Sequence, residues 1–115
     1  MIRTVNDLDA YKRSKRLYPE VIAASATFPP QGYHLRDQMC RSANAIHSDM
    51  TEGFGRSIAE FKMYLTRSLG SCNETISHIQ DAMNVYWMKQ DIGQHLADEY
   101  TIVGKQTYQL REHWK

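Results

Sequence analysis

The feature that most constrains this chain is a stripe of apolar and small residues that recurs every three or four positions between residues 61 and 87. Its members are Phe61, Tyr64, Leu65, Ser68, Leu69, Cys72, Thr75, Ile76, Ile79, Ala82, Met83, Tyr86 and Trp87. The spacing matches the 3.6-residue turn of an α-helix and continues for about seven turns. A helix with one apolar stripe must bury that stripe against partners, so the pattern predicts packed helices.

Three further segments have the same helical periodicity, and none alternates with the period of two that is typical of a strand. The helices are predicted at about 7–27, 33–51, 57–89 and 91–114, joined by short connections. Long amphipathic helices with short connections form antiparallel bundles. The sequence therefore predicts one all-α domain over residues 1–115, an up-down-up-down antiparallel four-helix bundle.

Local signals suggest where these helices begin and bend. Asn6 and Asp91 are candidate N-caps of the first and fourth helices, and Ser57 with Glu60 has the spacing of a capping box at the start of the third. Pro19 lies inside the first helix, where a proline removes one hydrogen bond. We expect the first helix to kink at Pro19 or to begin again there.

Composition limits the function classes. The chain has 14 Lys and Arg against 13 Asp and Glu, a net charge of +1, so any binding to nucleic acid depends on local charge placement. Two cysteines, Cys40 and Cys72, are too few for a disulfide scaffold. With no apolar run typical of a signal peptide or a membrane span, we expect a cytoplasmic protein with reduced thiols that does not contact a membrane.

The first helix carries the best candidate for a nucleic-acid interface. Four cations within two turns are predicted to lie opposite its apolar stripe: Lys12, Arg13, Lys15 and Arg16. The alternative is an ordinary solvated face. Tyr11 and Tyr18 could stack on bases, but they lie on the apolar side and are predicted to be core or interface residues.

A glycine-containing turn follows the second helix. It comprises Glu52, Gly53, Phe54, Gly55 and Arg56, and together with Arg41 it adds two arginines to the nucleic-acid candidates. The turn could cradle a phosphate before the next helix, but it lacks the spacing of known phosphate-binding loops. The preferred interpretation is structural, with Gly53 as a left-handed cap and Glu52 paired to Arg56 or Arg41.

Metal chemistry is not predicted. Glu74 and His78 lie four residues apart, as do His95 and Glu99, and we expect surface ion pairs from both. Neither pair has the Glu-x-x-His spacing of di-iron bundles, and the cysteines lack metal-ligand spacing. No metal and no cofactor are therefore expected.

The chain resembles the bacterial family of 23S rRNA intervening-sequence proteins. The resemblance runs over nearly the whole chain through Asp7-Leu8-Asp9-Ala10-Tyr11, Phe28-Pro29, Gly32-Tyr33, Leu35, Gln38 to Ala43, Ile46, Glu52 to Arg56, Phe61 to Leu65 and Leu69-Gly70-Ser71. It implies a four-helix bundle that assembles into homopentameric rings and has no established enzymatic activity. The family is similar to the accessory variability proteins of diversity-generating retroelements, which bind a reverse transcriptase and nucleic acid. The chain departs from the family pattern at His47 and Asp49, where proline and asparagine are common.

These observations favour a non-enzymatic, oligomeric scaffold or accessory protein that binds RNA or DNA, a reverse transcriptase, or both. One alternative is a metal-independent RNase of the HEPN type that uses Arg41 and His47, although these residues project about 120° apart on a helix. A second alternative is a module that binds only proteins. Four apolar residues off the predicted stripes are candidates for an oligomer interface: Met63, Met88, Ile102 and Tyr108.

Overall fold

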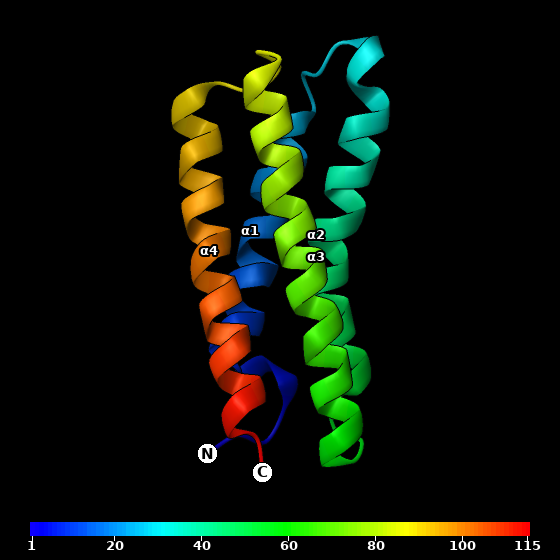
Figure 1. The fold of residues 1–115 in the computed structure, drawn as a ribbon, viewed down its shortest axis with the longest axis vertical. Helices are drawn as coiled ribbons and strands as arrows, with labels where there is room; N and C mark the ends of the chain where they lie inside the picture. The colour runs from blue at the N-terminus through cyan, green and yellow to red at the C-terminus, as the bar shows by residue number, and fades with distance from the viewer.

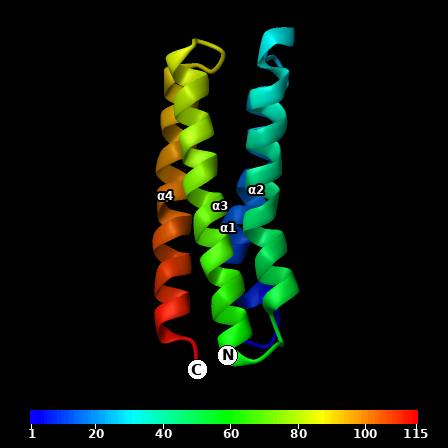
Figure 2. The same ribbon diagram turned by 45° about the vertical axis from the view of Figure 1, so that its right-hand side comes forward.

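A computed structural model describes residues 1–115 and confirms the predicted all-α four-helix bundle (Figure 1). The helices are α1 (Asp9–Ser25), α2 (Tyr33–Gly53), α3 (Ile58–Asn84) and α4 (Gln90–His113), with short 3₁₀ turns at Val5–Asp7 and Pro30–Gly32. The bundle measures 44 × 22 × 18 Å. α1 and α3 each pack against both α2 and α4, and α3 lies beside α4 along its length (Figure 2). No helix has an apolar stretch that could cross a bilayer.

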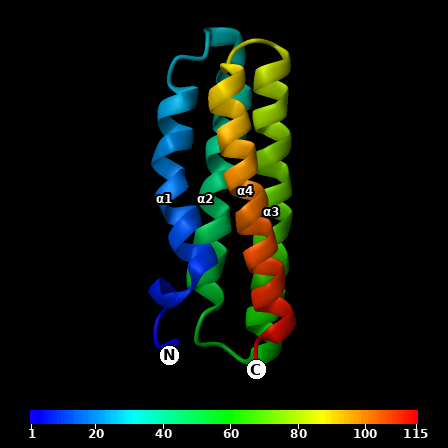
Figure 3. The same cartoon turned by 90° about the vertical axis from the view of Figure 1, so that its left-hand side faces the viewer.

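Both chain termini lie at the end of the bundle that carries the α2–α3 turn (Figure 3). The opposite end carries the α1–α2 and α3–α4 connections (Figure 3). The two ends therefore differ in which loops they present, and we call the second one the α3–α4 end.

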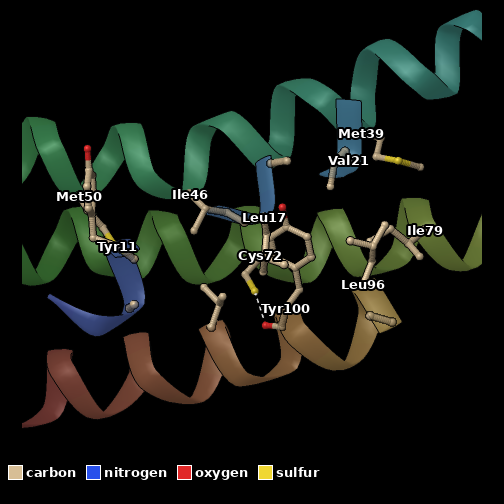
Figure 4. Close-up of a cluster of buried hydrophobic side chains, with 14 of the residues drawn as sticks. Tyr11, Leu17, Val21, Met39, Ile46, Met50, Cys72, Ile79, Leu96 and Tyr100 are labelled. Atoms are coloured by element: carbon tan, nitrogen blue, oxygen red, sulfur yellow. Dashed lines mark hydrogen bonds between the residues drawn. The ribbon is translucent and has the colours of Figure 1, made fainter. Parts of the chain in front are cut away.

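The core runs along the bundle axis and takes side chains from all four helices (Figure 4). Leu17, Ile46, Cys72 and Tyr100 represent α1 to α4 in its middle, each at most 1% exposed. The Cys72 thiol donates a hydrogen bond to the Tyr100 carbonyl oxygen at 3.0 Å (Figure 4). Burial raises the pKa of Cys72 to about 12, because a thiolate would be poorly solvated there. Cys72 is thus a packing residue, and Cys40 is also a free thiol.

The start of α1 differs from the prediction, because Asn6 does not cap it. The Asp7 carboxylate accepts hydrogen bonds from the backbone N–H groups of Arg3 and Thr4, at 2.8 and 2.9 Å. These bonds close a 3₁₀ turn at Val5–Asp7, and α1 begins only at Asp9. A local polar side chain thus stabilises a separate turn that competes with the longer helix.

Of the two outcomes predicted at Pro19, a second start of the helix does not occur. α1 runs without a break from Asp9 to Ser25, with Pro19 in its interior. Pro19 lies on the exposed side of the helix. The Lys15 carbonyl that Pro19 leaves without a backbone donor can therefore be hydrated, which lowers the penalty for the missing hydrogen bond.

The connection from α3 to α4 starts earlier than the apolar stripe predicts. α3 ends at Asn84, and Tyr86 has a left-handed backbone with φ of 63°. The N–H of Tyr86 bonds to the Met83 carbonyl at 3.1 Å, and that of Trp87 bonds to the Ala82 carbonyl at 2.9 Å. This is a Schellman motif, which usually has glycine at the left-handed position.

Of the N-caps predicted for α3 and α4, the first is present in the structure and the second is not. The Ser57 cap is confirmed, since its Oγ accepts from the Glu60 N–H at 3.1 Å. The Asp91 cap is wrong, because α4 begins at Gln90 after Lys89, and Asp91 accepts only from the N–H of Ile92 at 2.9 Å. The Gln90 side chain instead donates to the Met83 carbonyl at 3.2 Å, which ties α4 to the end of α3.

Candidate nucleic-acid interface

The four cations of α1 do not form one free cluster. Arg13 and Arg16 both bond to the same carboxylate oxygen of Glu99 on α4, with N–O distances of 2.9 and 3.1 Å. At about 100° per residue, the four side chains span an arc of about 160° in the order 15, 12, 16 and 13, and the half of this arc that holds positions 16 and 13 lies toward Glu99 on α4. The prediction of four equivalent cations is corrected to two that are neutralised by Glu99 and two that are not.

Lys12 and Lys15 remain available to a ligand, and both are exposed. Lys12 approaches Asp9 at 3.8 Å, but both side chains are more than half exposed, so the pair is weak. The Lys15 ammonium lies 5.9 Å from the centre of the Tyr11 ring, a cation–π contact that leaves its hydrogen-bond donors free. These two lysines form the candidate site that we call the α1 lysine face.

The surrounding charge supports this assignment. With four cations and two anions, α1 has a net charge of +2, which falls to +1 when the Glu99 carboxylate that binds its two arginines is included, whereas acidic residues outnumber Lys and Arg in each of α2, α3 and α4. A nearly neutral protein can attract a polyanion when one edge carries its positive charge. The α1 lysine face is the part of the helical bundle that best meets this requirement.

The tyrosines beside this face pack inward, as predicted. Tyr11 and Tyr18 make edge-to-face contacts with the His47 ring, at centroid distances of 6.3 and 5.4 Å. The Ser14 hydroxyl lies 3.2 Å from His47 Nδ1. Burial, assisted by the Lys15 charge, lowers the pKa of His47 from 6.5 to about 4, so the imidazole is neutral at pH 7. This cluster joins α1 to α2 and supports the backbone that carries Lys15.

Arg41 and His47 do not meet within one chain. Arg41 is exposed, while His47 is only 4% exposed and contacts α1. This agrees with the angular separation expected from the helix, and a proton donor or acceptor at His47 would have little access to an RNA phosphate. Arg41 makes no ion pair, so it remains a candidate contact for a polyanion.

The turn at residues 52–56 is stabilised by its own contacts. A Cβ on Gly53 would lie 2.6 Å from the Tyr64 Cβ, so α2 and α3 approach too closely for any side chain there. Gly55 has the left-handed backbone, with φ of +86°, which corrects the assignment of that conformation to Gly53. Arg56 Nε donates to the Glu52 carbonyl at 2.8 Å, and its guanidinium approaches Glu60 at 3.6 Å. These contacts occupy Arg56 within the turn.

Of the two predicted carboxylate–histidine pairs, only one forms. His78 lies 3.7 Å from Glu74. His95 bonds instead to Glu20 on α1 at 3.1 Å, because Glu99 is bound to the two arginines. Nowhere do three His, Cys, Asp or Glu side chains gather closely enough to hold a metal ion.

The four apolar residues predicted to lie at an oligomer interface differ in how exposed their side chains are. Met63, Ile102 and Tyr108 are 46%, 37% and 46% exposed, as an interaction surface requires. Met88 is only 4% exposed, because the chain reverses after α3 and turns this side chain into the core. Met88 is therefore a core residue and does not contribute to an interaction surface.

Comparison with known proteins places the chain beside one family. The family described as 23S rRNA-intervening sequence protein matches residues 6–109. A crystal structure of a protein of unknown function from the S23 ribosomal protein family of Bacteroides thetaiotaomicron has the same fold, with a TM-score of 0.69 and 20% sequence identity. The alignment covers 95% of this chain and 99% of that one. No curated protein matches the sequence.

Proposed function

The chain belongs to the family of 23S rRNA-intervening sequence proteins, and from this premise we propose that it is a non-enzymatic, self-associating scaffold that binds nucleic acid through α1. The observation that carries the proposal is the α1 lysine face, where Lys12 and Lys15 are exposed on the helix with the highest positive charge. Contacts between such cations and phosphates release counterions and need no particular base sequence.

In this proposal, self-association compensates for the small number of cations that each copy offers. Two lysines can contact only a few phosphates, which gives weak binding that salt readily removes. Copies that present their lysine faces together convert later contacts into intramolecular ones and raise the overall affinity without new chemistry. The exposed apolar side chains of Met63, Ile102 and Tyr108 are consistent with surfaces that associate.

Charge reversal tests the lysine face. We expect the double variant Lys12→Glu/Lys15→Glu to lose affinity for a fluorescein-labelled structured RNA by at least about tenfold at low salt, because two attractive contacts become repulsive. Fluorescence anisotropy measures the affinity, and Lys105→Glu, an exposed lysine on α4, is the matched control. Equal affinities for the wild type and the double variant would exclude the lysine face as the binding surface.

The ion pair with Glu99 leads to a prediction of the opposite sign. We expect Glu99→Gln to strengthen RNA binding by about three- to tenfold, because it releases the guanidinium charges of Arg13 and Arg16 beside the lysine face. Glutamine keeps the shape of the side chain and one acceptor oxygen, and circular dichroism can verify that the helices are retained. A folded Glu99→Gln protein with unchanged or weaker binding would contradict the proposed location.

A further inference from the structure

The charges of the bundle are separated along its long axis. At the level of Leu17, Cys72 and Tyr100 the bundle divides into two halves, and the half at the α3–α4 end contains residues 18–43 and 73–99 (Figure 1). This half has three Lys and Arg against seven Asp and Glu, whereas the half at the chain termini has 11 against six. The net charge of +1 therefore conceals a basic half, which carries the α1 lysine face, and an acidic half at the opposite end.

An apolar groove lies in the acidic half, between the last turns of α1 and the first turns of α4. Two adjoining hollows of about 660 and 440 Å³ form it and share Ala23, Ala24 and Ile92 in their linings. The two alanines leave room that a larger side chain would fill, and Ile92 is 40% exposed. A groove between two helices fits the apolar edge of a third helix.

Two carboxylates on α4 border this groove without a cationic partner in the chain. Asp91 lines the groove and accepts only from the backbone N–H of Ile92, at 2.9 Å. Asp98 lies seven residues further along α4, and therefore on the same side of the helix, where it accepts only from the Gln94 side chain, at 2.8 Å. Both residues are exposed, so their charges remain available to cations of a ligand.

The other charged groups in the lining do not offset this pair. Glu20 bonds to His95 of the same chain at 3.1 Å, so this contact satisfies both side chains within the bundle. Lys89 is the one Lys or Arg in the lining, and it belongs to the connection that precedes α4. The α4 border of the groove is therefore acidic.

Tyr86 projects from the connection that borders the groove. Its side chain is 89% exposed, and its backbone is left-handed, with φ of 63°. The neighbouring backbone is fixed, since the N–H groups of Trp87 and Met88 both bond to the Ala82 carbonyl, at 2.9 and 3.2 Å. Unfavourable backbone conformations that persist in this way concentrate at functional sites. The exposed ring offers a face on which a Lys or Arg side chain of a ligand can stack.

We propose that this groove binds a basic amphipathic helix of a partner protein. The apolar side chains of that helix cover Ala23, Ala24 and Ile92. Its Lys or Arg side chains contact Asp91 and Asp98. The chemistry of the occupant follows from the surface, because an apolar floor needs apolar side chains and unpaired carboxylates need cations.

The partner is a different protein rather than a second copy of this chain. The most basic segment of the chain is α1, and it turns Tyr11, Leu17 and Val21 into its own core. A second copy therefore does not present α1 as a helix that is both basic and apolar on its surface. The inference goes beyond the proposed function, because it assigns a protein ligand to the half of the bundle opposite the α1 lysine face.

A synthetic helix tests the groove directly. The probe is a fluorescein-labelled peptide of about 18 residues, with leucine at every third or fourth position and lysine on both sides of that stripe. We expect fluorescence anisotropy to give a dissociation constant between about 1 and 100 µM, as is typical of a small interface. A scrambled peptide of the same composition and a peptide with glutamate in place of lysine both bind at least about tenfold more weakly, because each lacks one half of the recognition.

Two variants locate the peptide on the protein. We expect Asp91→Lys/Asp98→Lys to lower the affinity at least about tenfold, because two attractive contacts become repulsive. The matched control is Asp37→Lys/Glu74→Lys, which makes the same change of charge at exposed carboxylates outside the groove and changes the affinity less than about threefold. Ala23→Trp fills the groove without a change of charge and also lowers the affinity at least about tenfold. Circular dichroism verifies that each variant keeps its helices.

The outcomes separate the groove from the proposed function. Failure of the wild type to bind the amphipathic peptide at up to about 500 µM overturns the inference. Equal affinities for the wild type and Ala23→Trp, for the wild type and Asp91→Lys/Asp98→Lys, or for the amphipathic and scrambled peptides overturn it as well. Self-association in sedimentation velocity that Ala23→Trp abolishes would identify a second copy as the occupant and would also show the inference to be wrong. RNA binding is measured separately, and its failure in the wild type would overturn the proposed function while leaving the peptide result intact.

Discussion

Gly53→Ala is expected to destabilise the bundle by about 3 kcal/mol, because overpacking a rigid contact is among the more damaging single changes. The new Cβ would lie 2.6 Å from the Cβ of Tyr64 and 2.7 Å from its Cγ. These atoms are next to the α3 backbone and cannot rotate away, so α2 and α3 would have to separate. Tyr64 is 8% exposed, and its hydroxyl approaches the Glu52 carboxylate at 3.5 Å, so separation would also disturb the turn.

The matched control for this change is Gly70→Ala on α3. No atom lies within 4 Å of the position of its Cβ, and the residue is inside a helix. The same substitution is therefore expected to stabilise the protein by up to about 1 kcal/mol, because alanine has a higher helix propensity. Urea unfolding followed by circular dichroism measures both. A Gly53→Ala protein as stable as the wild type would show that α2 and α3 do not approach as closely as described.

Acid is expected to weaken the protein through His47. The pKa of His47 is about 4 in the folded state and near 6.5 in the unfolded chain. Between these values the unfolded chain binds a proton that the folded protein does not, so stability falls as the pH drops from about 6.5 to 4. The full difference corresponds to roughly 3 kcal/mol, and below pH 4 this residue causes no further loss.

The variant His47→Asn isolates this effect. Its amide oxygen can accept from the Ser14 hydroxyl in place of Nδ1, but it cannot be protonated in this range. We expect the variant to be less stable than the wild type at pH 7, because the ring contacts with Tyr11 and Tyr18 are lost, and to lose less stability on acidification. Urea unfolding at pH 7, 5.5 and 4.5 measures the difference, with the exposed His34→Asn as control. Parallel pH profiles for His47→Asn and the wild type would contradict the assignment.

The helical bundle could be predicted from the sequence because its main determinant is periodic. The stripe on α3 places Phe61, Leu65, Cys72 and Ile79 on one face, and all four are buried. The ends of the helices depend on competition between nearby polar groups, which periodicity does not reveal. Asp7 closes a turn of its own before α1, and the apolar stripe continues past Asn84 although the backbone reverses at Tyr86.

The candidate site was harder to predict, because contacts between helices decide which of its cations are neutralised and which remain free. Lys12, Arg13, Lys15 and Arg16 are equivalent in a count of charges, yet Glu99 neutralises two of them. Glu99 is more than 80 residues away along the chain, and its own sequence neighbour His95 suggested a different partner. The periodicity of α1 gives only the order of these side chains around the helix, with positions 12 and 16 about 40° apart, so the division depends on the contact with Glu99.

The most direct test of nucleic-acid binding by the α1 lysine face is the salt dependence of RNA affinity. The logarithm of the association constant is measured against the logarithm of salt concentration for the wild type and for Lys12→Gln/Lys15→Gln. Each phosphate contact contributes about 0.7 to 0.9 to the slope, so two lysines account for about 1.4 to 1.8 per bound chain. We expect the variant to have a slope shallower by this amount and the Glu99→Gln protein to have a steeper one. Identical slopes for the wild type and the lysine variant would show that α1 does not contact the phosphates.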